Sequence, residues 1–154
     1  MHEGTKRKSR GLALLWKPHL NLSLQLVSQN HIGIVHEDVG GQSEWRLIGL
    51  YGHLEEEKKI KTWQIMRSLI NVSIPWLCFG NFNEILYNDE KKGGKLKTQA
   101  TLDAFGMMVN ACDLHDLGFM RHPFTWFNNQ QEGGNVQERM DLFSGKRVWL
   151  QLFY

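Results

Sequence analysis

The sequence predicts an α/β fold with a core of β-sheet and helices on the outside. Two patterns lead to this prediction: three or four strand-like segments occupy the first third of the chain, and helix-like segments alternate with strands after them. A length of 154 residues is enough to bury a core, and 42% hydrophobic with 22% charged residues is typical of a globular protein. We expect one domain over residues 11–154, after a basic, disordered tail over residues 1–10.

The first strands are predicted by the spacing of apolar residues. Residues 11–16 are apolar but too few for a helix, which predicts a buried strand. Leucine alternates with polar residues over residues 20–26, the strongest strand signal in the chain, so we expect this segment to be buried in a two-sheet core. Apolar segments at residues 32–35 and 45–51 predict a hairpin that turns at the Gly-Gly pair 40–41.

Two helices are predicted by apolar residues spaced three and four positions apart. The first covers residues 55–69, begins with acidic residues that suit the helix dipole, and would bury Ile60, Trp63, Met66 and Ile70. The second covers residues 98–112 and would bury Leu102, Phe105, Val109 and Cys112.

A short apolar run at residues 76–79 lies between the helices and predicts a central strand. A charged loop follows at residues 88–97, and its lysines suit either a solvated surface or a contact with phosphate. The rest of the chain predicts an extended piece at 114–118 and two strands, at 124–127 and 136–143, joined by a hairpin loop.

Composition narrows the possible classes of protein. The net charge of +2 is too mild to establish a nucleic-acid partner. The basic tail suits a frayed terminus, a phosphate-binding arm or a nuclear localisation signal. Cys78 and Cys112 have no close partner in sequence and are typical of buried thiols in an intracellular protein. We see no secretory signal and no run near the roughly 20 apolar residues of a membrane helix, so no membrane partner is expected.

No metal site is predicted from the residues themselves. His31 with His36, and His115 with His122, lack the spacing of a zinc site. Residues 81–86 begin like a calcium loop but have Leu86 where that loop needs glycine. No small-molecule cofactor is indicated either.

The segment around which the chain is organised is residues 75–86, where a buried strand ends in short oxygen-bearing side chains. Ligands of open α/β sheets usually bind at such strand ends. Gly80-Asn81-Phe82-Asn83-Glu84-Ile85-Leu86 resembles the Gly-Asp-Phe-Asn-Glu-Ile-Leu signature of the endonuclease/exonuclease/phosphatase family, in its plant LINE-type retroelement branch. Other motifs match this family in order: Gly11–Lys17, Tyr51-Gly52 with Lys61–Trp63, Glu90–Gly94, Asp116–Gly118, Pro123–Trp126 with Asn128, and Glu138–Asp141.

The resemblance implies a four-layer α/β sandwich of the DNase I-like type and Mg²⁺-dependent hydrolysis of phosphodiesters, that is, DNA nicking. It assigns the active-site positions to Tyr51, Asn83 and Asp141, and it places Asn81 where the family has an aspartate that orients or deprotonates water. It assigns nucleic-acid contacts to Thr125, Trp126, Asn128 and Arg139. Trp126 and Trp63 remain open to a second interpretation, as core residues.

We expect the domain to be incomplete at both ends. The family's metal-binding glutamate would precede residue 11, and its Ser-Asp-His segment would follow residue 154. Three hypotheses follow. The chain is a retroelement-derived endonuclease with impaired catalysis, a non-catalytic nucleic-acid-binding remnant that binds DNA weakly and without sequence preference, or a poorly folded relic with no selected role.

Overall fold

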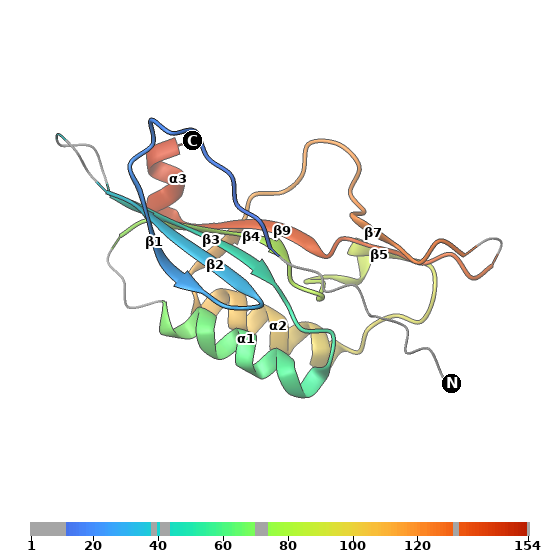
Figure 1. Ribbon diagram of the computed structural model, residues 1–154. Helices are drawn as coiled ribbons and strands as arrows, with labels where there is room; N and C mark the ends of the chain where they lie inside the picture. The colour runs from blue at the N-terminus through green and yellow to red at the C-terminus, as the bar shows by residue number, and fades with distance from the viewer. Residues whose placement is uncertain (1–11, 38–39, 41–43, 70–73, 131–132, 154) are drawn as a thin grey trace, which may run out of the picture.

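A computed structural model describes residues 12–37, 40, 44–69, 74–130 and 133–153. Its main element is a six-stranded sheet in the order β1-β2-β3-β4-β9-β6, and a small sheet in the order β5-β8-β7 lies at one end (Figure 1). The strands are β1 (Leu22–Val27), β2 (His31–His36), β3 (Trp45–Tyr51), β4 (Trp76–Asn81), β5 (Lys91–Lys92), β6 (Leu114–Asp116), β7 (Trp126–Phe127), β8 (Gln137–Glu138) and β9 (Asp141–Lys146). The helices are α1 (Glu56–Ser68), α2 (Gln99–Ala111), α3 (Arg147–Phe153) and a 3₁₀ turn, Asn88–Glu90.

The six-stranded sheet is mixed. Strands β1, β2 and β3 form an antiparallel meander, β3 pairs with β4 in parallel, and β9 pairs antiparallel with both β4 and β6. The parallel pair needs a crossover connection, and α1 provides it. The α/β class predicted from the sequence is confirmed, as are the hairpin of β2 with β3 and that of β7 with β8.

One face of this sheet, the helix face, carries the core. Helices α1 and α2 lie side by side beneath it (Figure 1). The predicted buried face of α2 is confirmed, because Leu102, Phe105, Val109 and Cys112 are all buried. They pack with Trp76 and Cys78 of the central strand and with the other members of one cluster: Ile48, Leu50, Met66, Phe82, Met108, Leu114 and Leu142.

The buried face of α1 differs from the prediction. Ile60 is 54% exposed, while Lys59 and Thr62 are buried together with Met66. Lys59 is held by the carboxylate of Glu84, which follows β4, and this ion pair turns the polar side of the helix toward the sheet. Apolar spacing missed this because it assigns charged side chains to the solvent. Ile70 lies outside the described residues.

Two predictions for the N-terminal part are wrong. Residues 12–16 form no strand, and Leu24 of β1 is 58% exposed. Leu24 is exposed because β1 is the last strand of the sheet and its pairing with β2 is irregular between Leu24 and Leu26. The predicted tail over residues 1–10 lies outside the described residues, as does Gly41.

The end of the chain covers part of the opposite face of the sheet. The apolar residues at 149–153 form α3, in which the Trp149 ring packs edge-on against Trp45 of β3 at 5.4 Å between ring centroids. Elsewhere on this face Phe79 and Phe143 stack at 5.7 Å, and Phe143 is 51% exposed. Strand 124–127 is shorter than predicted, since only Trp126 and Phe127 pair. Among the described residues, no helix has the length and apolar character needed to cross a membrane.

A buried histidine predicts a pH dependence of stability. Burial lowers the pKa of His31 below its ordinary 6.5. The unfolded chain therefore binds the proton more readily, so the free energy of unfolding is highest above pH 6.5 and falls as the pH drops through the folded-state pKa. We expect thermal melts between pH 8 and pH 5 to show a weaker pH dependence for His31→Gln than for the wild type. The exposed His19→Gln serves as the control, and equal slopes for wild type and His31→Gln would contradict the prediction.

Candidate functional site

Three of the predicted site residues lie in one row across the sheet. Tyr51 is the register partner of Asn81 in the parallel pair, and Asn81 is the partner of Asp141 in the antiparallel pair. Register partners project to the same face, and here that face is opposite to the helix face. The row stands at the end of β3, the end of β4 and the start of β9, so it forms one edge of the sheet.

The turn after β4 is held by two asparagines. The Asn81 Oδ1 accepts a hydrogen bond from the backbone N–H of Asn83 at 2.8 Å, and the Asn83 Nδ2 donates to the carbonyl of Gly52. Asn83 has a φ of 53°, a left-handed conformation that asparagine tolerates better than most residues. Gly52 lies so near that a Cβ on it would be 2.3 Å from the Phe82 carbonyl oxygen. Asn83 is buried, and its hydrogen bond to Gly52 ties the segment that follows Tyr51 to the end of β4.

Tyr51 is positioned by a residue that the sequence analysis did not identify. The Asn30 Nδ2 donates to the Tyr51 carbonyl, and the Tyr51 N–H donates to the Asn30 carbonyl, both at 2.8 Å. No local pattern links residues 21 positions apart, so only the pairing of β2 with β3 could reveal this contact.

A hollow of about 490 Å³ gathers five of the eight predicted residues: Tyr51, Asn81, Asn83, Trp126 and Asn128. The other three, Thr125, Arg139 and Asp141, line a neighbouring hollow of about 650 Å³. The side chain of Thr125 connects the two hollows. Its Oγ1 accepts hydrogen bonds from the backbone N–H groups of Met140 (3.1 Å) and Asp141 (3.0 Å). All eight predicted residues thus line the two hollows at one end of the sheet.

The β7–β8 hairpin forms one wall of the first hollow. Asn128 closes the hairpin, since its Nδ2 donates to the Gly134 carbonyl and its Oδ1 accepts from the N–H groups of Val136 and Gln130. Trp126, two residues before Asn128, lines the hollow and is half-buried. It is therefore neither a buried core residue nor a fully exposed one.

The eighth residue, Arg139, is buried within an ion-pair cluster. Its guanidinium donates to both carboxylate oxygens of Asp116, at 2.7 and 2.8 Å, and to Glu90 at 2.7 Å. The hydrogen bonds and charge of Asp116, with a smaller effect of Glu90, outweigh burial and raise the pKa of Arg139. These contacts join β6 and the 3₁₀ turn to the residue that follows β8, so the guanidinium holds the hairpin in place.

A second buried ion cluster, formed by Glu84, supports the turn after β4. The Glu84 carboxylate, 1% exposed, pairs with Lys59 of α1 and with Lys97 of the loop before α2, the latter at 2.5 Å. This role of Glu84 was not predicted. The sequence signal that could have revealed it is a glutamate between Asn83 and Ile85 in an otherwise buried segment.

The donor set of the row does not fit a Mg²⁺ site. Mg²⁺ binds through carboxylates in near-octahedral oxygen coordination, and Asp141 supplies the single carboxylate of the row. Within the described part of the chain, no group of three or more His, Cys, Asp or Glu side chains is arranged to hold a metal ion. No step that depends on a metal is therefore assigned to these residues.

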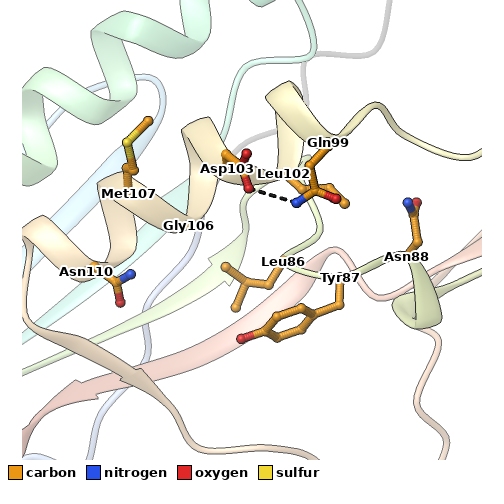
Figure 2. A pocket seen from close by; sticks show the side chains of 9 residues that line it. All are labelled: Leu86, Tyr87, Asn88, Gln99, Leu102, Asp103, Gly106, Met107 and Asn110. Carbon is orange, nitrogen blue, oxygen red and sulfur yellow. Dashed lines mark hydrogen bonds between the residues drawn. The ribbon is translucent and has the colours of Figure 1, made fainter.

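A separate groove of about 620 Å³ lies beside α2 and contains none of the predicted residues. Figure 2 shows Leu86 and Tyr87 facing α2 across it, with Asp103 and Gln99 joined by a 2.8 Å hydrogen bond on the helix.

The comparisons with known proteins show the fold. No protein-family model matches the chain, and no curated protein matches it either. The chain is similar in structure to the endonuclease domain of TRAS1, a telomere-specific non-LTR retrotransposon, with a TM-score of 0.67 and 15% identity over 90% of this chain and 61% of that one. It thus spans about three fifths of that domain's length.

Two more solved structures resemble the chain. Beta toxin of Staphylococcus aureus superposes with a TM-score of 0.50 at 14% identity, covering 77% of this chain and 43% of the toxin. TDP2 from C. elegans superposes with a TM-score of 0.43 at 12% identity, covering 82% of this chain and 41% of TDP2. At 14–15% identity, the likeness to the TRAS1 domain and to beta toxin shows the fold alone, and that fold is DNase I-like.

Proposed function

We propose that this chain is a LINE-type retroelement endonuclease domain that holds a phosphodiester of DNA but is impaired in its hydrolysis. The observation that carries the proposal is the row of Tyr51, Asn81 and Asp141 beside the hollow of the β7–β8 hairpin. The likeness to the retrotransposon endonuclease domain supports the class of substrate.

The hydrogen bonding of the Asn81 side chain supports binding of phosphate. Its Oδ1 is engaged by the N–H of Asn83, so the group that it can offer to a ligand is its NH₂, a hydrogen-bond donor. A donor at this position suits a phosphate oxygen. A carboxylate there would repel the phosphate charge.

The same residue argues against efficient hydrolysis. A general base takes a proton from water, and an amide does not do so at neutral pH. Loss of a positioned base costs about 10² to 10⁴ in rate. Tyr51, which lines the same hollow, then adds its hydroxyl as a second hydrogen-bond donor for the phosphate. Thr125 orients the start of β9, and Arg139 holds the hairpin.

The decisive experiment compares nicking with binding. We expect no Mg²⁺-dependent relaxation of supercoiled plasmid by the wild type, yet binding of a fluorescent DNA duplex that falls steeply as salt rises. Asn81→Asp should not create nicking, and it should weaken binding about tenfold or more, because a hydrogen bond to a charged group contributes about 1.5–3 kcal/mol.

Asn110→Asp is the matched control, since it makes the same chemical change on the exposed side of α2. It should leave binding close to that of the wild type. Nicking by the wild type that a chelator abolishes would disprove the impairment and leave the class of substrate intact. Absence of DNA binding at low salt would disprove the whole proposal. Binding without nicking that Asn81→Asp leaves unchanged would favour a non-catalytic surface elsewhere on the chain.

A further inference from the structure

The outer edge of β1 has the features of a pairing surface. Strand β1 ends the six-stranded sheet, and in the described residues no further strand lies beside it. Proteins usually protect such an edge with lysine, proline or other interruptions. Residues 20–30 contain no charged residue, no proline and no glycine. The strand nevertheless exposes Leu24, at 58%, and Val27, at 63%.

The hydrogen bonds to β2 show which backbone groups point outward. The N–H of Glu37 donates to the Asn21 carbonyl, so these two residues form a hydrogen-bonded pair. Such pairs recur at every second residue of an antiparallel ladder, which makes Ser23 with Val35 the next one. The backbone N–H and C=O groups of Leu22 and Leu24 therefore point away from β2, toward the open edge.

The sequence of this edge is nearly symmetric. Reading outward from Ser23, both directions give leucine, then an amide residue, then leucine: Leu20-Asn21-Leu22-Ser23-Leu24-Gln25-Leu26. A twofold axis through Ser23 would pair this strand with its own copy in antiparallel fashion. Leu22 of each copy would then lie opposite Leu24 of the other, and these are the residues whose backbone groups point outward.

We propose that β1 pairs with β1 of a second copy of this chain, joining the two six-stranded sheets into one. The pairing places four leucines, Leu22 and Leu24 from each copy, together on the face opposite to the helices, where Leu24 is now exposed. Serine and amide side chains meet on the other face, and no like charges oppose each other. The irregularity between Leu24 and Leu26 confines the pairing to the first half of the strand. The site row lies on β3, β4 and β9, so this interface is independent of the proposed function.

The test combines the association state with a cross-link. Sedimentation velocity of the wild type should show a concentration-dependent dimer, and Leu24→Lys should abolish it, because each copy would bring a lysine into the leucine cluster. Met120→Lys, a fully exposed methionine remote from β1, should leave the dimer unchanged. Circular dichroism checks that both variants are folded.

A cysteine at the axis tests the register directly. Ser23 would face its own copy as a non-hydrogen-bonded pair, in which Cα atoms are about 4.5 Å apart, within the range of a disulfide. Ser23→Cys should therefore form a disulfide dimer under mild oxidation, whereas Glu57→Cys on the exposed side of α1 should not. The two native cysteines are buried and should not interfere. A wild type that stays monomeric, a dimer that survives Leu24→Lys, or cross-linking of Ser23→Cys no faster than Glu57→Cys would overturn the proposal.

Discussion

Gly80→Ala is expected to destabilise the protein by at least about 3 kcal/mol, since it combines backbone strain with a collision. Gly80 has a φ of +131°, which residues with a side chain rarely adopt, and a Cβ there would be 2.0 Å from the Leu50 carbonyl oxygen in the neighbouring strand. That oxygen belongs to the backbone of a central strand and has no room to move. A melt should show a fall of roughly 6–12 °C or a failure to fold, given about 2–4 °C per kcal/mol for a domain of this size.

Gly106→Ala is the matched control for that substitution. Gly106 lies within α2, and a Cβ on it would meet nothing within 4 Å. Alanine has the higher helix propensity, so this variant should be as stable as the wild type or more stable by up to about 1 kcal/mol. Equal melting temperatures for Gly80→Ala and the wild type would show that the end of β4 is not packed as described.

Glu84→Gln is expected to cost roughly 3–5 kcal/mol, because it leaves two lysines beside a neutral amide in a buried place. Glu84 is 1% exposed and pairs with Lys59 and Lys97, and Lys59 itself is 5% exposed. Urea unfolding should show the loss as a lower midpoint. Glu56→Gln is the control, since Glu56 pairs with the same Lys59 but its side chain is 74% exposed. It should cost less than about 1 kcal/mol.

The same cluster predicts a dependence on alkaline pH. Burial lowers the pKa of Lys59, but hydrogen bonds and charge from Glu56 and Glu84 outweigh it, so the pKa is raised above the ordinary 10.5. A raised pKa contributes stability that is complete below pH 10.5 and is lost as the pH rises through the folded-state value. The wild type should therefore lose stability above that pH more steeply than Glu84→Gln. A similar loss in Glu56→Gln and Glu84→Gln at neutral pH would contradict the buried pairing.

The sequence by itself determined the kinds of element and most of their positions. Short apolar runs located the β2–β3 hairpin and the central strand β4, and a spacing of three to four residues located both long helices. Both kinds of signal belong to a single segment of the chain. The place of Asn81 at the end of a buried strand was visible in the same way. So was the apolar face of α2, where every expected residue is buried.

Only the tertiary structure decided which segments pair with each other and which side chains are buried. The row of Tyr51, Asn81 and Asp141 depends on the register of three strands, and register is a property of pairs of segments. Arg139 was expected to contact nucleic acid, but its guanidinium is buried because Asp116 and Glu90, each more than 20 positions away, pair with it in space. Leu24 lies in the segment with the strongest alternation of the chain, residues 20–26, yet its side chain is exposed. Alternation shows which residues share a face of the sheet, but it does not show whether other residues cover that face.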